Sequence, residues 1–371
     1  MKSVSRRALI IGAAALAVAG CTTPPAPTSA PAALAPVQVT SATPEPEQPP
    51  TPAGPPVWPL TGLPLKDPAQ AAHAAIAVKV PDNRNEHPQS GIDKADIVFV
   101  ELDGYPAAIG QSGTRLVPVF HSAMAPDVGP VRSIRPVDVA LLSPIHAIIG
   151  NTGGARWTLN YFAQNAPALT YDLSYMKTKG TGAYGIDSSR VYTLRGHKYY
   201  DHAVICHPEI LAKQTSQTTA PPVPYFPFAA SPDEVSTTVA GKPAKHVAVP
   251  WKKGHSYDMT YDYDKKSGRY LRSMPWGKHV LKDGTRVATD NVLVILANQH
   301  FAHHEPFHDI TGKSGTFYYA HGGAYVTGTW SKGDPETPFV FTLADGSPLQ
   351  MAPGKTFVEL PNVGAKVVFS G

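Results

Sequence analysis

The chain has 371 residues, of which 42% are hydrophobic and 16% are charged, and its formal net charge is +4. This length allows one large domain or two smaller ones. Three of the 32 basic residues, Lys2, Arg6 and Arg7, lie in the first 20 residues, which have the pattern of a cleaved signal peptide. The rest of the chain has 29 basic and 28 acidic residues. That balance excludes the basic surface typical of nucleic-acid-binding proteins, and it also excludes a polybasic membrane tether.

Residues 1–20 have the pattern of a secretory signal peptide. Basic residues precede an apolar run over 8–19 that is too short to span a bilayer as a permanent helix. Gly20 then precedes Cys21, and a small residue before cysteine is typical of the processing site of bacterial lipoproteins. We therefore predict that Cys21 is lipidated and anchors the chain at the extracytoplasmic face of the cell membrane. An ordinary signal peptide is the alternative, and the paired arginines leave general or twin-arginine export open.

Residues 21–58 have the composition of an extended tether. They contain 12 of the 39 prolines, together with Ala, Thr and Ser, and no Lys or Arg. Such a segment cannot bury a core and favours polyproline-II geometry, with a rise of about 3 Å per residue. Fully extended, it spans on the order of 100 Å.

Residues 59–212 predict a mixed α/β domain. Short apolar runs rich in β-branched residues predict buried strands at 75–80, 97–100 and 116–120. Pro118 lies inside the third run and predicts that this strand is at a sheet edge or an end. Residues 137–149 predict a helix followed by a strand.

A second segment of low order, 213–233, predicts an interdomain linker, and 234–371 predicts a second domain that is mostly antiparallel β. Apolar and polar residues alternate over 257–264, which is the period of a half-buried strand. Further strands are predicted at 292–297, 317–320, 324–330, 339–343 and 356–360. The predicted fold class is therefore α+β.

Several segments are shared with a known family. In the first half they are Pro59-Leu60-Thr61-Gly62, Asp82-Asn83, Pro88-Gln89-Ser90-Gly91, Ala95-Asp96-Ile97-Val98, Glu101, Thr114-Arg115 and Gly129-Pro130-Val131-Arg132-Ser133-Ile134-Arg135-Pro136. In the second half they are Tyr261-Asp262-Tyr263-Asp264, Tyr270-Leu271-Arg272, Asp290-Asn291-Val292 and Gly328-Thr329-Trp330. The chain resembles the YerB-like lipoproteins of bacteria, a two-domain family with no established activity. It departs from that pattern at His87, where the family has Arg, and at 109–113, where a Glu-Gly-Gly run is usual. The resemblance implies architecture and location, and no reaction.

Polar residues within these segments are the candidate ligand-binding residues, because they lie at the ends of apolar runs or in loops bounded by Gly and Pro. They are Asp82, Asn83, Gln89, Ser90, Glu101, Arg115, Arg132, Ser133 and Arg135. Arginine's planar fork suits carboxylate or phosphate. We predict that Arg115, Arg132 and Arg135 hold an anionic envelope ligand, with Asp82 and Glu101 as acid and base or as positioning groups.

An internal salt-bridge network is the alternative for the same residues. In that interpretation, the three arginines pair with Asp82, Asp96 and Glu101 and hold the domain together. The residue pattern by itself leaves both interpretations open.

Residues 304–308 match the H-E-x-x-H zinc pattern, in which two histidines share one helical face. Pro306 opposes a helix there, and the resemblance places the segment in a loop between two strands. His304 and His308 are therefore weak candidates for a metal, and we predict no cofactor. Cys206 follows an apolar run and is expected to be a buried structural thiol.

The leading hypothesis is a lipid-anchored extracytoplasmic protein that binds an anionic envelope ligand, with no nucleic acid as partner. An enzyme is less favoured than a binding protein. One alternative is an envelope hydrolase, metal-dependent at 304–308 or using Asp82 and Glu101. Another is a structural or assembly partner that acts through the β domain.

Overall fold

The computed structural model describes residues 55–104, 113–216, 220–252, 255 and 257–371. The predicted signal peptide, Cys21 and nearly all of the predicted tether lie outside the described residues, as does part of the predicted linker. The described residues belong to one compact unit, Ala53–Gly371.

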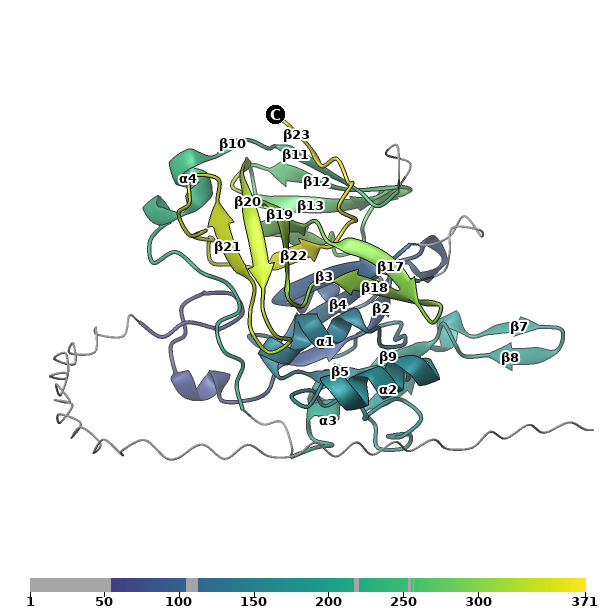
Figure 1. Ribbon diagram of the computed structural model, residues 1–371. Coiled ribbons are helices and arrows are strands. Elements are labelled where there is room, and N and C mark those ends of the chain that lie inside the picture. The colour runs from purple at the N-terminus through teal and green to yellow at the C-terminus, as the bar shows by residue number, and fades with distance from the viewer. Residues whose placement is uncertain (1–54, 105–112, 217–219, 253–254, 256) are drawn as a thin grey trace, which may run out of the picture. The chain divides into compact units, whose positions relative to one another are not determined.

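Strands dominate the described part of the chain (Figure 1). The largest sheet contains β1 (Ile76–Val78), β2 (Val80–Pro81), β3 (Ile97–Leu102), β4 (Thr114–Phe120), β5 (Ile148–Gly150), β10 (Lys242–Pro243), β16 (Asn291–Ile295), β19 (Lys313–His321), β20 (Ala324–Lys332), β21 (Val340–Leu343) and β22 (Thr356–Glu359). A smaller sheet contains β11 (His246–Pro250), β12 (Asp258–Asp264), β13 (Arg269–Met274), β14 (Gly277–Lys278), β15 (Ala288–Thr289) and β23 (Val368–Ser370).

Three two-stranded ladders and several short helices complete the unit. The ladders pair β6 (Tyr184–Ile186) with β9 (Val204–Cys206), β7 (Tyr192–Leu194) with β8 (His197–Tyr199), and β17 (Asn298–Ala302) with β18 (Glu305–Asp309). The α-helices are α1 (Val137–Leu142), α2 (Arg156–Asn165), α3 (Pro208–Ala212) and α4 (Ser236–Ala240). The 3-10 helices are η1 (Pro68–Ala71), η2 (Arg84–Glu86), η3 (Ile92–Lys94), η5 (Ser143–Ile145), η6 (Ser188–Arg190) and η7 (Pro232–Glu234).

The large sheet runs through both halves of the sequence. Its central order is β10-β20-β19-β16-β22-β3-β4-β1-β5. β22 lies between β16 and β3 and is parallel to both, so that Thr356 is opposite Asn291 on one side and Ile97 on the other. The first half contributes mixed pairings and the second half mostly antiparallel ones, which confirms the predicted α+β class. The predicted domain boundaries stay a prediction.

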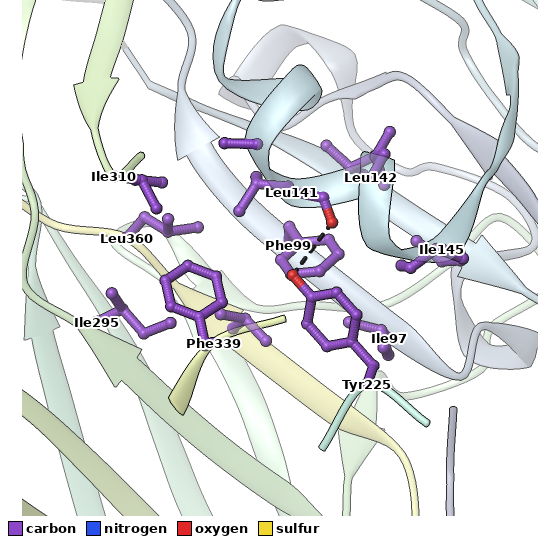
Figure 2. Packing of buried hydrophobic residues seen from close by; sticks show 14 of the residues in the cluster. Ile97, Phe99, Leu141, Leu142, Ile145, Tyr225, Ile295, Ile310, Phe339 and Leu360 are labelled. Atoms are coloured by element: carbon purple, nitrogen blue, oxygen red, sulfur yellow. Dashed lines mark hydrogen bonds between the residues drawn. The ribbon is translucent and has the colours of Figure 1, made fainter. Parts of the chain in front are cut away.

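Each face of the large sheet buries its own core, because successive side chains of a strand point to opposite faces. In β3, Ile97 and Phe99 belong to one cluster, while Val98 and Val100 belong to the other. Figure 2 shows the first cluster, where residues of α1 pack beside Phe99 and Tyr225 donates a hydrogen bond to the carbonyl oxygen of Leu141 (3.1 Å). The second cluster includes residues of the smaller sheet. The large sheet is therefore buried on both faces.

The position of Pro118 corrects the sequence prediction. Its strand, β4, is an inner strand with β3 on one side and β1 and β2 on the other. β4 pairs with β1 as far as Val119, which is opposite Ala77, and it pairs with β2 from Leu116, which is opposite Val80. The ladder is interrupted between Leu116 and Val119. Pro118 has no N–H to donate and falls in this interruption, so the sheet tolerates it away from an edge.

Candidate functional site

Arg115 and Arg135 converge on one buried carboxylate, Asp103. Arg115 Nη2 forms an ion pair with Asp103 Oδ1, and Arg135 Nη2 lies 3.8 Å from the same oxygen. Arg115 Nη1 also donates to the carbonyl oxygen of Ser133 (2.7 Å). Burial acts to raise the pKa of Asp103, but the two guanidiniums outweigh it and hold the pKa below its ordinary value. These two arginines are therefore committed to contacts within the chain.

Glu101 belongs to a second buried charge cluster. Lys79 Nζ lies 2.5 Å from Glu101 Oε1 and 2.6 Å from Asp138 Oδ1, and all three side chains are fully buried. One ammonium cannot neutralise two carboxylates. Burial, together with the charge of Asp138, raises the pKa of Glu101 to about 8. Glu101 is thus mostly protonated at neutral pH and is shielded from solvent.

Asp82 pairs with an arginine of the second half. Arg272 Nη2 lies 2.7 Å from Asp82 Oδ2, Nη1 lies 3.4 Å from Oδ1, and both side chains are fully buried. Burial acts to raise the pKa of Asp82, but the Arg272 charge outweighs it and lowers the pKa. Asp82 and Glu101, the predicted acid–base pair, are therefore both enclosed by the protein.

Gln89 extends this buried network. Its Nε2 donates to the carbonyl oxygen of Pro81 (2.9 Å), and its Oε1 lies 2.9 Å from His279 Nε2. Arg272 Nη1 donates to His279 Nδ1 (2.9 Å), and burial lowers the pKa of His279, so this ring is neutral and donates from Nε2 to Gln89.

Asp82, His87 and His279 bring three metal-ligand atoms within 4.8 Å of one another. The charge around these three residues does not favour a metal cation, however. The Arg272 guanidinium already contacts Asp82 and His279, so a metal ion would lie beside a fixed positive charge. These side chains therefore form a hydrogen-bonded contact between the two halves of the chain, and they do not form a metal site.

Arg132 lies apart from the other two predicted arginines. Its Nη2 lies 2.5 Å from Glu86 Oε1 and 2.6 Å from His202 Nδ1, and its Nη1 donates to the carbonyl oxygen of Asp201. His202 Nδ1 itself lies 2.7 Å from Glu86 Oε1, so both side chains contact the same carboxylate. The predicted trio therefore divides, with Arg115 and Arg135 at Asp103 and Arg132 at Glu86. The salt-bridge interpretation expected the three arginines to pair with Asp82, Asp96 and Glu101. Their acidic partners are Asp103, Glu305 and Glu86 instead.

His202 lines a pocket of about 510 Å³. The residues that line the pocket come from distant parts of the chain and are Asn85, His87, Pro88, Ser189, Arg190, Tyr192, His202 and Lys282. Apart from Tyr192, every ionisable residue in this described lining is basic. Arg132 lies directly behind it, through its contact with His202.

The cations of this pocket are positioned by backbone and carboxylate groups. Arg190 Nη2 donates to the carbonyl oxygens of Glu86 (3.1 Å) and Pro88. Lys282 Nζ lies 2.7 Å from Asp187 Oδ2, and the Asp187 carboxylate also accepts a hydrogen bond from the Ser189 N–H (3.1 Å) at the start of η6. Arg190 Nε also lies 3.6 Å from Asp187 Oδ2, so the two cations share one carboxylate. Asp187 itself is not among the residues that line this pocket.

The remaining predicted residues lie elsewhere. Asn83 Nδ2 donates to Asp103 Oδ2 (2.8 Å), next to Arg115. Ser133 contributes its carbonyl oxygen to Arg115. Ser90 lines a second pocket of about 550 Å³, which shares Lys282 with the first. Its described lining includes four aspartates, so an anion is disfavoured there.

The H-E-x-x-H segment is neither a helix nor wholly a loop. Residues 305–309 form β18, and His304 lies in the turn before it with a φ of 66°. His308 is buried, and burial lowers its pKa to about 3. The segment lacks the helical face on which the two histidines of an H-E-x-x-H zinc site lie. Cys206 is buried as expected, and burial raises the pKa of its thiol.

Sequence reasoning missed Lys79, Asp103, Arg190, Arg272 and Lys282. Lys79 and Arg272 did have a local signal. Lys79 interrupts an apolar run, and Arg272 shares the inward face of β13 with Tyr270 and Met274. A charge on the apolar face of a strand indicates a buried partner. Arg190 and Lys282 are far apart in sequence and have no such signal.

Comparisons with known proteins agree with this architecture. A family model described as "Protein of unknown function (DUF3048) N-terminal domain" matches residues 60–219, and the model of the C-terminal domain matches 247–358. A protein named "Putative lipoprotein YerB" from Bacillus subtilis (strain 168) is 27% identical over 321 residues, which is 84% of this chain and 88% of the relative. The crystal structure of YerB from Bacillus subtilis has a TM-score of 0.67 at 22% identity, covering 84% of this chain and 99% of that one, and so has the same fold. Among the described residues, we find no helix of the length and apolarity needed to span a membrane.

Proposed function

Since the chain belongs to the YerB-like DUF3048 family, we propose that it is a lipid-anchored extracytoplasmic protein that binds an anionic ligand of the cell envelope. The anchor would be the lipid on Cys21. The lipoprotein name of the Bacillus subtilis relative supports this part of the proposal.

The observation that carries the binding proposal is the basic pocket formed by η6, the segment around His87, and Lys282. Its volume of about 510 Å³ is within the range of small-molecule sites. Arg190 and Lys282 place two positive charges at this pocket, which would attract a phosphate or carboxylate. Arg132 would contribute from behind by orienting His202. This moves the proposed binding from the predicted arginine trio to one of its members and to cations that the sequence did not suggest.

Arg115 and Arg135 have a different role in this proposal. Arg115 pairs with Asp103, and Arg135 lies 3.8 Å from Asp103 and 3.6 Å from Glu305, so each arginine has an acidic partner within the chain. They would therefore hold the end of β3 in place and would not contact the ligand. The hydrolase and assembly alternatives stay predictions.

A titration tests the pocket directly. The full-length chain in detergent micelles is titrated with inorganic pyrophosphate in a calorimeter. A variant with Arg190→Gln and Lys282→Gln should bind about 100-fold more weakly or worse, because each of the two lost charge-assisted hydrogen bonds contributes about 1.5–3 kcal/mol. Lys266→Gln, in an exposed turn, is the matched control and should bind as the parent does. Equal affinity in all three proteins would refute the pocket as the binding site.

A further inference from the structure

The β7–β8 hairpin is an unusually exposed element of this fold. All six of its strand residues are exposed, and within the described part of the chain its strands pair only with each other. Figure 1 shows it extending from the rest of the compact unit. An isolated two-stranded hairpin is marginally stable in water, so its exposed apolar surface calls for an explanation.

The apolar surface of this hairpin is aromatic and aliphatic. Tyr192 and Tyr199 are each 39% exposed, Tyr200 is 47% exposed, and Leu194, beside the turn, is 54% exposed. Tyr192 and Tyr199 are opposite each other, with ring centroids 5.2 Å apart and an interplanar angle of 11°. This stack stiffens the hairpin. The Tyr192 ring also lies 5.6 Å from the His202 ring, which joins the base of the hairpin to the rest of the unit.

The charge of the hairpin has one sign. From Tyr192 to Tyr199 the sequence contains Arg195, His197 and Lys198, and it contains no Asp or Glu. Exposed tyrosines with adjacent basic residues are typical of segments that lie at a bilayer interface, where the rings occupy the headgroup region and the cations attract anionic lipids.

The predicted lipid anchor would also keep the hairpin close to a bilayer. If Cys21 is lipidated, the tether keeps the compact unit within on the order of 100 Å of the membrane. The membrane is then present at a high effective concentration, which favours even a weak contact. The membrane contact of the hairpin therefore rests on the lipid anchor of the proposed function, and it does not rest on the ligand pocket.

We propose that the β7–β8 hairpin is a membrane-contacting arm that lies on a bilayer containing anionic lipids, with Leu194 and the tyrosines in the interface and Arg195 and Lys198 at the headgroups. It would give the lipid-anchored protein a second, reversible attachment.

The arm can be tested in the full-length protein reconstituted into vesicles. An environment-sensitive fluorophore is placed on Leu194→Cys, because Cys206 is buried and a lipidated Cys21 has no free thiol. Val239→Cys, on α4 and 69% exposed, is the matched control site. Vesicles contain brominated phosphatidylcholine, with or without phosphatidylglycerol.

We expect the brominated lipid to quench the label at 194 in the vesicles with phosphatidylglycerol, and to leave the label at 239 unquenched. Adding Arg195→Gln and Lys198→Gln should lower the equilibrium constant for arm contact about 30-fold, because each cation near an anionic surface contributes about 1 kcal/mol. Loss of quenching in these variants would support the proposal.

Three outcomes would overturn it. If the protein floats with the vesicles but the label at 194 stays in water, the anchor stands and the arm does not. If the protein does not float with the vesicles at all, the anchor and the arm both fail. If soluble polyphosphate shifts the label while brominated lipid does not quench it, the arm binds a polyanion and not a bilayer.

Discussion

Arg272 and Asp82 form a fully buried ion pair, with Nη2 2.7 Å from Oδ2, that joins the second half of the chain to the first. Arg272 comes from β13 of the smaller sheet, and Asp82 directly follows β2 of the large sheet. The pair therefore fixes how the two sheets meet.

Replacing Asp82 should destabilise the fold strongly. Asp82→Asn keeps the shape of the side chain but leaves the Arg272 charge without its main partner, which costs about 3–5 kcal/mol in a buried site. Urea unfolding at pH 7 measures the change. Asp262→Asn is the control, because Asp262 is exposed and pairs with His246 at the surface, where such pairs contribute at most about 1 kcal/mol. Similar small losses in both variants would mean that the buried pair does not join the halves.

Glu101 should make stability depend on pH in an unusual direction. Its pKa is about 8 in the folded protein, whereas the ordinary pKa of a glutamate is 4.5, so between these values the folded state binds more protons than the unfolded state. Stability from this group is therefore present below about pH 4.5 and is lost as the pH rises to about 8, by up to about 1.4 kcal/mol per pH unit.

Glu101→Gln mimics the protonated side chain and should remove that loss. Unfolding free energies measured from pH 5 to pH 8 should converge with those of the parent at pH 5, and the variant should be the more stable protein at pH 8. Exposed Glu209→Gln should leave the slope unchanged. If parent and Glu101→Gln curves stay parallel, Glu101 is ionised in the fold.

Gly328 is required by close packing of backbones. A Cβ atom at this position would lie 2.0 Å from the carbonyl oxygen of Thr342, in the neighbouring strand β21. Gly328→Ala should therefore separate β20 from β21 and cost about 2 kcal/mol or more. At Gly364, a Cβ atom meets nothing within 4 Å, so Gly364→Ala should leave the thermal midpoint almost unchanged. Equal midpoints for the two variants would contradict this account of the Gly328-Thr329-Trp330 segment.

The predicted arginines should separate into two classes. Arg115→Gln leaves Asp103 buried beside a weaker partner and should lower stability by about 3 kcal/mol, while folded molecules bind pyrophosphate as before. Arg132→Gln should weaken pyrophosphate binding about tenfold, with a loss of stability of about 1 kcal/mol, because Arg132 supports the pocket through His202 and is partly exposed. Unfolding and calorimetric titration of the same preparations measure both quantities. If Arg115→Gln weakened pyrophosphate binding and Arg132→Gln did not, the ligand would bind at Arg115 and not at the pocket beside His202.

Local sequence predicted many of the strands of this protein, its fold class and its family, although it placed a loop where β18 lies and did not predict β7 and β8. The alternation over 257–264 reappears in β12, whose inward residues Met259 and Tyr261 are buried, because strand period is a property of neighbouring residues. The same pattern contained no information on the order of the strands. Only the tertiary structure places β22 between β16 and β3, and it thereby decides which charges meet.

The candidate site depended on that order. The pairing of Asp82 with Arg272 joins residues 190 positions apart, and the pocket joins Arg190 to Lys282. Arginines three positions apart, Arg132 and Arg135, were expected to act together and instead contact Glu86 and Asp103. Sequence determined which side chains carry charge, whereas the partner of each charge was decided by long-range packing, because an ion pair depends on distance in space and has no period along the chain.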